Sequence, residues 1–208
     1  MRNIFLLIIV VVLFSCIKEQ EKIKLPDITN ESNYRITSKK ENDTVIKING
    51  ENDEYTLTGY KDIKNNVKVG WWEVRDIKKD HLYKIEYISL DKNKENQVKF
   101  FEKGHLINRF SQYYETLYHN NGYEFKFYFP LYSNEDAKVE FGYITTDGTT
   151  PPLRKTIKCK KENDYYICFI PLKDKNQLIA GTVNKFSSKN DKNNSILLSS
   201  TSMYVYNR

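Results

Sequence analysis

Short runs of strand-forming residues, separated by turn-forming clusters, recur through the chain from about residue 43 onward. They are rich in Val, Ile, Tyr, Phe and Thr, which favour strands, and Asn, Asp, Gly and Lys fill the intervals. The first series is Thr44–Ile48, Glu54–Tyr60, Val67–Arg75, Leu82–Leu90 and Gln97–Glu102. Such short intervals leave no room for helical crossovers, so the pattern predicts an antiparallel meander. We therefore expect an all-β protein with a first β domain over residues 35–118.

A second series of runs begins near residue 120. Its members are Tyr123–Phe129, Lys138–Thr145, Lys155–Lys160, Tyr165–Leu172, Gln177–Val183 and Thr201–Tyr206. Prolines lie at the ends of several runs, where a missing N–H does not interrupt a sheet. This density of short strands predicts a small β-sandwich, immunoglobulin-like, over residues 120–208. The polar stretch from Ser187 to Ser195 is expected to be a loop.

The segment between the two series has no single interpretation. Leu106, Phe110, Tyr113 and Leu117 have the spacing of one helix face, although aromatic and β-branched neighbours also suit a strand. The sequence therefore favours neither of two alternatives for this segment, a short helix near residues 106–118 or an additional strand.

The N-terminus has the order of a secretory signal. Arg2 precedes an unbroken apolar run from Ile4 to Phe14. As a helix this run would be about 16 Å long, well short of the ~30 Å hydrocarbon core of a bilayer. We therefore predict a cleaved signal peptide over residues 1–15, in preference to a membrane-spanning helix.

The end of this segment, Leu13-Phe14-Ser15-Cys16, resembles the lipobox of bacterial lipoproteins. That resemblance implies cleavage before Cys16 and acylation of its thiol; Phe14 is bulkier than the residue usually found there. The alternative is an ordinary secretory signal with an incidental cysteine. The charged start of residues 16–34 resembles export tags of Bacteroidetes-type surface lipoproteins, and we expect this segment to be a flexible tether. The expected location is the cell envelope, on the outer membrane. The sequence does not indicate whether the protein lies on the periplasmic face or on the surface face of that membrane.

The charge balance argues against a nucleic-acid partner. Removing residues 1–15 removes only Arg2, so the net charge falls from +6 to +5. The lysines are interleaved with Asp and Glu along the chain, whereas nucleic-acid binders gather positive charge on one element or patch. The membrane, reached through lipid on Cys16, is therefore the first expected partner, with an envelope protein or polysaccharide as a further one.

The segment Val67-Lys68-Val69-Gly70-Trp71-Trp72 resembles the variant MORN repeats of bacterial envelope proteins. A fainter copy lies 24 residues further on, because Lys79-Asp80-His81-Leu82 aligns with Lys103-Gly104-His105-Leu106. The resemblance covers roughly residues 59–115 and departs from the family in having Asp80 where the turn carries glycine. It implies stacked β-hairpins and a scaffold role. Some relatives are labelled antitoxin-like, so an antitoxin or immunity role is open by analogy.

Adjacent Trp71 and Trp72 must point to opposite faces of a strand. Both rings are buried if the sheet lies between two layers. If the sheet is covered on one side only, one ring is exposed and could bind a sugar or a partner. The residues proposed for such a platform are Trp71, Trp72, Tyr83, Tyr87 and Phe100.

Cys159 and Cys168 flank a predicted hairpin with Asn163-Asp164 as its two-residue loop. Counting outward from this loop places the two cysteines opposite each other at a non-hydrogen-bonded pair, where Cα atoms are about 4.5 Å apart. That distance lies within the range of a disulfide. We predict a Cys159–Cys168 bond, with two unpaired thiols as the alternative.

The sequence offers no catalytic or metal-binding motif. His81, His105 and His119 are not at metal-ligand spacing from one another or from a cysteine. Gly-rich phosphate loops and hydrolase signatures are also lacking. We therefore expect no enzyme activity and no cofactor. The main hypothesis is a non-catalytic scaffold or interaction lipoprotein, and the alternative is binding of carbohydrate or another envelope polymer through exposed aromatics.

Overall fold

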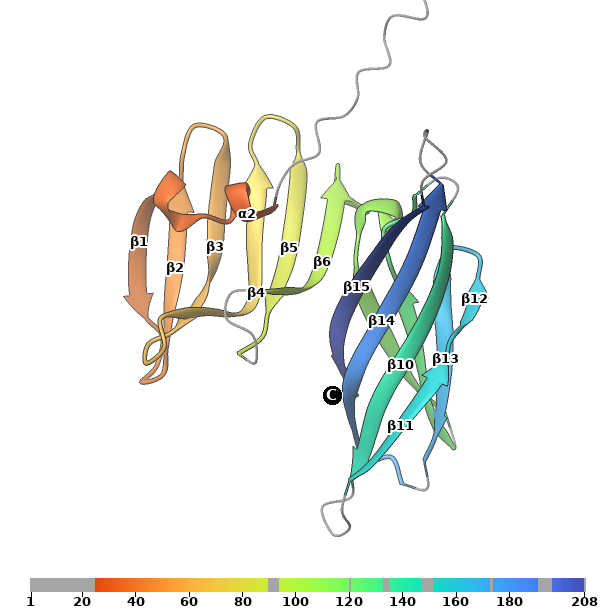
Figure 1. Cartoon of the computed structure of the whole chain (residues 1–208). Helices are drawn as coiled ribbons and strands as arrows, with labels where there is room; N and C mark the ends of the chain where they lie inside the picture. Colours follow the sequence, from red (N-terminus) through yellow and green to blue (C-terminus); the bar gives the residue numbers. More distant parts are fainter. Residues whose placement is uncertain are drawn as a thin grey trace, which may run out of the picture. The chain divides into compact units, whose positions relative to one another are not determined.

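The computed structural model describes residues 25–89, 94–119, 121–132, 135–146, 152–172, 174–190 and 196–207. The chain divides into two units, Met1–Asn30 and Glu31–Arg208. The described part of the first unit contains the one-turn helix α2 (Leu25–Ile28), which Thr29 closes by donating from its N–H and hydroxyl to the Leu25 carbonyl. The second unit is all-β, as the sequence predicts (Figure 1). None of the helices in the described ranges is long and apolar enough to cross a membrane.

A seven-stranded antiparallel sheet forms the first part of the second unit, and each strand pairs with the next along the chain. The strands are β1 (Arg35–Lys40), β2 (Val45–Glu51), β3 (Tyr55–Asp62), β4 (Val67–Asp76), β5 (His81–Tyr87), β6 (Glu95–Glu102) and β7 (His105–Leu106). This is the predicted meander. The sequence did not indicate β1, because all six of its residues are exposed and no apolar alternation marks it.

Asn and Asp side chains close the turns between these strands. Asn42, Asn52, Asp62 and Asp76 each accept hydrogen bonds from backbone N–H groups two or three residues further on. These side chains replace a backbone partner at the point where the chain reverses. The aligned turn residues Asp80 and Gly104 both have positive φ, 51° and 78°, so Asp80 adopts a positive φ at the position where the family's turn carries glycine.

The segment before β1 is attached to the sheet. Residues Glu31–Asn33 form the 3-10 helix η1, and the Glu31 carboxylate lies 3.3 Å from the Lys61 ammonium with both side chains largely buried. Tyr34 contacts Gly50, where an added Cβ would lie 3.0 Å from the tyrosine Cβ. The end of the segment that we expected to be a flexible tether therefore packs on the sheet.

The second part of the unit is a β-sandwich of two four-stranded sheets (Figure 1). One sheet has the order β11-β10-β14-β15, built from β10 (Asp136–Thr146), β11 (Leu153–Lys158), β14 (Leu178–Asn190) and β15 (Ile196–Tyr206). The other has the order β12-β13-β9-β8, built from β8 (Tyr113–His119), β9 (Gly122–Tyr128), β12 (Lys160–Glu162) and β13 (Tyr165–Pro171). Phe125, Phe127, Phe141, Ile179 and Val183 are fully buried between them.

Two strand assignments differ from the sequence-based expectation. The open segment 106–118 becomes the 3-10 helix η2 (Asn108–Phe110) followed by β8, which pairs with β9 although it precedes residue 120. The expected loop from residue 187 begins later, because Ser187–Asn190 continue β14 and pair with Ile196–Ser199 of β15. Residues 191–195 of that loop lie outside the described ranges.

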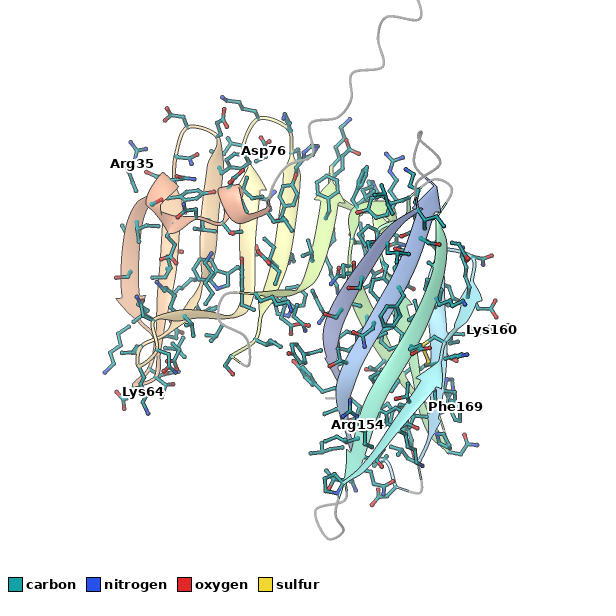
Figure 2. All side chains as sticks on the ribbon, viewed as in Figure 1. Arg35, Lys64, Asp76, Arg154, Lys160 and Phe169 are labelled. Atoms are coloured by element: carbon teal, nitrogen blue, oxygen red, sulfur yellow. A yellow bond between two sulfur atoms is a disulfide. The ribbon has the colours of Figure 1, made fainter. Side chains whose placement is uncertain are left out.

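A disulfide joins Cys159 and Cys168, with Cα atoms 4.8 Å apart. Figure 2 shows it in yellow beside the labelled Lys160. The hairpin has the register counted from the sequence, with Lys160 opposite Ile167 and Glu162 opposite Tyr165. Asn163 takes positive φ in the turn. Cys168 packs in the sandwich core and Cys159 packs partly against it.

Reduction of this disulfide is expected to lower the free energy of unfolding by about 2–3 kcal/mol, because the bond constrains a short loop of the unfolded chain. Urea unfolding with and without reductant measures the difference. The Cys159→Ser and Cys168→Ser double variant should unfold at the same urea concentration with and without reductant. An unchanged midpoint for the unsubstituted chain in reductant would contradict the prediction.

Candidate functional site

Cys16 and the preceding lipobox-like residues lie outside the described residues. The described ranges offer two places where side chains of functional type come together. One is the exposed face of the meander around Trp71, and the other is a buried polar cluster beside the C-terminal half of β15.

The two tryptophans lie on opposite faces of β4. Trp72 is fully buried, whereas Trp71 is 38% exposed. The alternative in which both rings are buried is therefore wrong, because only one face of the sheet is covered at this position. Tyr83, Tyr87 and Phe100 are buried like Trp72. The five aromatic residues proposed for a binding platform do not form one exposed surface, and only Trp71 remains accessible.

Trp71 belongs to a mixed apolar and charged surface. The residue directly opposite Trp71 on β5 is the buried Glu86. The other neighbours on its face are Glu73 on β4, Lys84 opposite Glu73, and Lys99 opposite Lys84. Lys84 and Glu73 form an ion pair at 2.7 Å, and the Lys99 ammonium lies 5.6 Å from the centre of the Trp71 ring. We call these four residues the Trp71 surface. An accessible indole beside charged groups is suited to stacking on a sugar ring or anchoring a protein partner.

Lys99 also links Trp71 to a row of tyrosines on the sandwich. Its ammonium lies 4.9 Å from the Tyr113 ring, and Tyr113 stacks on Tyr128 with centroids 4.3 Å apart. Burial, together with the nearby Glu115 carboxylate, raises the pKa of Tyr128 to about 12. Its phenol therefore stays protonated and donates to Glu115. Since Tyr113 and Tyr128 are buried, this row supports the position of Lys99 and adds no accessible ring to the Trp71 surface.

The polar cluster centres on the buried carboxylate of Glu86. Asn96 and Gln97 each donate a side-chain amide hydrogen to Glu86 at 2.8 Å. The Tyr206 hydroxyl donates to the same carboxylate at 3.4 Å. Burial and the Glu86 carboxylate raise the pKa of Tyr206, so its hydroxyl keeps the proton that it donates. The cluster thus satisfies a buried carboxylate through neutral donors.

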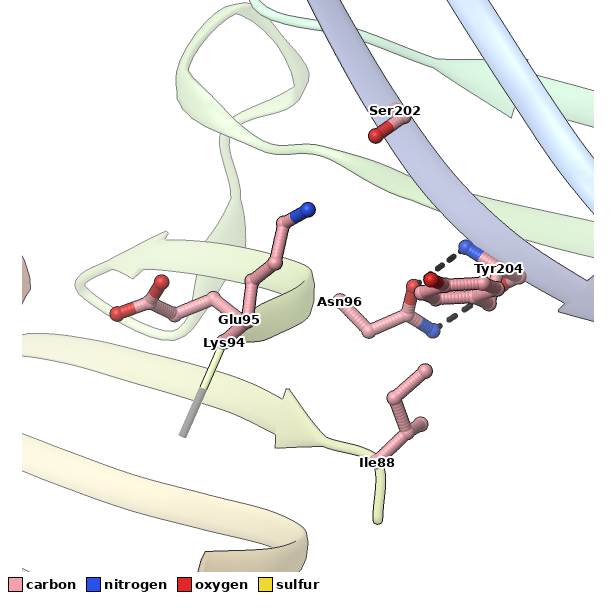
Figure 3. A pocket seen from close by; sticks show the side chains of 6 residues that line it. All are labelled: Ile88, Lys94, Glu95, Asn96, Ser202 and Tyr204. Carbon is pink, nitrogen blue, oxygen red and sulfur yellow. Dashed lines mark hydrogen bonds between the residues drawn. The ribbon is translucent and has the colours of Figure 1, made fainter. Parts of the chain in front are cut away.

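The same cluster covers part of the outer backbone of β15. The Asn96 amide accepts from the Tyr204 N–H at 2.7 Å and donates to the Tyr204 carbonyl at 3.1 Å, as the dashed lines in Figure 3 show. Gln112 donates to the Ser202 carbonyl at 3.3 Å. The Tyr114 hydroxyl bonds both the N–H and the carbonyl of Tyr206. Three side chains therefore take the place of a neighbouring strand along Ser202–Tyr206.

Replacing Asn96 with alanine is expected to lower the free energy of unfolding by about 2–3 kcal/mol, because buried groups of Tyr204 and Glu86 lose their partner. Chemical denaturation measures the effect. Asn49→Ala removes an exposed amide from the same sheet and should change stability by less than about 0.5 kcal/mol. Equal effects of the two substitutions would contradict the role assigned to Asn96.

The space beside this cluster is small. Asn96, Ser202 and Tyr204 line a pocket with Ile88, Lys94 and Glu95 (Figure 3). Its cavity volume is about 10 Å³, enough for roughly one water molecule. In the described ranges, no group of three or more His, Cys, Asp or Glu residues is arranged to hold a metal ion. His81 and His119 lie beside different carboxylates, those of Glu102 and Glu124.

Comparisons with family models, with curated proteins and with solved structures found no match to the chain. The resemblances to lipoproteins and to MORN repeats therefore rest on the residues quoted for them.

Sequence analysis did not single out the cluster around Glu86. Its members are ordinary polar residues of predicted strands and turns, and no motif connects Asn96 with Tyr204 across 108 positions. One signal was available: Glu86 stands in an otherwise apolar part of β5, between Ile85 and Tyr87, which are both buried.

Proposed function

We propose that this chain is a bacterial lipoprotein, anchored to the cell envelope by lipid on Cys16, whose β domains act as a non-catalytic interaction module. The observation that carries the proposal is the order of residues 2–16: one positive charge, an apolar run too short to span a bilayer, a small residue and a cysteine. Acylation with two or more chains would hold the protein stably on a membrane.

The use of cysteine supports this proposal. Cys159 and Cys168 bond to each other, so Cys16 is the one remaining cysteine of the three in the chain. Disulfides of this kind persist in oxidising compartments such as the bacterial periplasm and cell surface. An exported protein with one acylated cysteine and one disulfide accounts for all three.

Metabolic labelling with palmitate in a bacterial host tests the anchor. The unsubstituted chain should take up label and partition into the membrane fraction, and Cys16→Ser should lose both properties. Ser15→Ala is the matched control, because it keeps a small residue before the cysteine and should be labelled. Label that persists in the Cys16→Ser chain would overturn the anchor.

The Trp71 surface supports the interaction role. It presents an accessible aromatic ring together with two lysines and a glutamate on one face of a sheet. Cross-linking in intact cells, followed by affinity purification, should recover a protein partner through Arg75→Cys, an exposed position on the same face of β4 that leaves Trp71 in place. Ile63→Cys provides a matched exposed position on the β3–β4 turn. Recovery of the same proteins through both positions would argue against a specific surface.

A second candidate function, binding of an envelope polysaccharide, is favoured by the same exposed indole. Trp71→Ala should then weaken binding to isolated cell-wall polysaccharide by about tenfold or more, which corresponds to about 1.4 kcal/mol. Ile63→Ala should leave binding unchanged. If the unsubstituted chain does not sediment with the polysaccharide, this second function is wrong and the protein-partner role stands alone.

A further inference from the structure

The outer edge of β15 differs between its two halves. Along Ser202–Tyr206 the outward backbone groups belong to residues 202, 204 and 206. Gln112 bonds the Ser202 carbonyl, and Asn96 and Tyr114 bond both the N–H and the carbonyl of Tyr204 and Tyr206, respectively. β15 pairs with β14 in one uninterrupted register from Ile196 to Tyr206. The alternation therefore continues, and the outward N–H and C=O groups of the other half are those of Ile196, Leu198 and Ser200.

No hydrogen bond from the described residues reaches the outward groups of this first half. Its apolar side chains are also unusually accessible, since Ile196 is 66% exposed and Leu198 is 80% exposed. Phe186 of β14 lies diagonally across from Leu198 on the same face and is exposed as well. An edge with free backbone groups and apolar side chains is a template for another strand.

The charge pattern of the sheet edges indicates which strand fits. Of the other edge strands, β1, β11 and β12 carry two or three Lys or Arg residues each, which oppose edge-to-edge pairing. β8 carries the carboxylate of Glu115, and β7 is only two residues long. β15 has no charged residue in its eleven positions, although charged residues make up 29% of the chain. In a protein with a net charge of +6, this edge is therefore one that two copies can bring together without like-charge repulsion between the paired strands.

We propose that β15 pairs antiparallel with β15 of a second copy of this chain, on a two-fold axis at Leu198. Ile196, Leu198 and Ser200 then face Ser200, Leu198 and Ile196 of the second copy, which forms about six backbone hydrogen bonds. The sheet β11-β10-β14-β15 of one copy and the same sheet of the second copy then join into one sheet of eight strands. Leu198 and Phe186 of both copies meet on one face of the joined sheet, where paired side chains stabilise the contact. This pairing does not depend on the lipid anchor.

Sedimentation of the full chain in detergent tests the pairing. The unsubstituted chain should form a dimer, and Leu198→Lys should weaken dimerisation by about tenfold or more, because it places two like charges opposite each other. Leu198 is so exposed that this substitution should leave the unfolding midpoint unchanged at protein concentrations low enough for the unsubstituted chain to be monomeric. Ser200→Pro removes an outward N–H that bonds nothing within the described chain, and should weaken the dimer to a similar extent.

Cysteine cross-linking tests the register. The Cα atoms of a hydrogen-bonded antiparallel pair are about 5.5 Å apart, within reach of a disulfide. Leu198→Cys should therefore form a disulfide-linked dimer under mild oxidation. Leu117→Cys, an exposed position on β8, should not. A monomer at all concentrations, a dimer that survives both Leu198→Lys and Ser200→Pro, equal cross-linking at Leu117→Cys, or a different protein captured at Leu198→Cys would each overturn the proposal.

Discussion

Replacing Lys185 with alanine is expected to lower the free energy of unfolding by about 3–5 kcal/mol. The Lys185 ammonium is buried at one end of the sandwich core, 2.6 Å from the Glu135 carboxylate and 3.1 Å from the Pro130 carbonyl. The rings of Phe129 and Tyr132 lie within 6 Å of it. The substitution would leave the Glu135 carboxylate, whose side chain is 10% exposed, without its cation. An unpaired buried charge lowers the stability of the folded state strongly.

Chemical denaturation measures this loss, and two further variants interpret it. Removing both charges with Lys185→Met and Glu135→Leu should recover most of the stability, because packed apolar groups often replace a buried ion pair at little cost. Lys40→Ala breaks the exposed pair with Asp43 and should cost less than about 1 kcal/mol. A double variant no more stable than Lys185→Ala would show that the charge pair is not the cause.

Replacing Trp72 with alanine is expected to cost a similar 3–5 kcal/mol. The Trp72 ring is fully buried, donates from its indole N–H to the Tyr60 carbonyl at 3.0 Å and packs edge-on against Tyr87. The substitution removes a large apolar area from the core of the meander and leaves a cavity. Thermal and urea unfolding measure the effect. Trp71→Ala, one residue away on the exposed face, should cost less than about 1 kcal/mol.

Gly59 explains why Trp72 is the buried one of the pair. A Cβ at residue 59 would lie 2.0 Å from the indole ring, so the ring rests directly on the glycine backbone. Gly59→Ala should therefore destabilise the unsubstituted chain by about 1–3 kcal/mol. In the Trp72→Ala background the same substitution should cost less, because the clash is gone. Equal costs in both backgrounds would contradict this contact.

The strands of the meander and the sandwich could be predicted because each buries one face, which imposes a two-residue alternation on the sequence. The hairpin that joins Cys159 to Cys168 could even be placed in register, since a two-residue turn fixes every pair outward from it. β1 could not be predicted, because both its faces are exposed. Lys185 and Phe186 invert the usual pattern, with the lysine buried and the aromatic ring exposed. The Glu135 carboxylate and the Pro130 carbonyl, which both contact the Lys185 ammonium, account for the burial of the lysine.

The candidate surfaces were less accessible to sequence reasoning. The adjacent tryptophans left open whether both rings are buried or one is exposed, and they did not indicate which ring would pack on Gly59 in the neighbouring strand. The caps on β15 depend on pairs far apart in the chain, such as Gln112 with Ser202. Periodicity reports local burial and carries no information about such pairs.

The separation of these pairs has a consequence for how the protein reaches its folded state. Asn96 and Tyr204 are 108 residues apart, and Tyr114 and Tyr206 are 92 apart. Contacts of this range require closure of a long loop before they contribute stability, and they slow folding relative to the local hairpins of the meander. Until they close, the whole edge of β15 lacks a neighbour and can pair with another chain. Along Ser202–Tyr206 this edge is protected only once Gln112, Asn96 and Tyr114 have reached it.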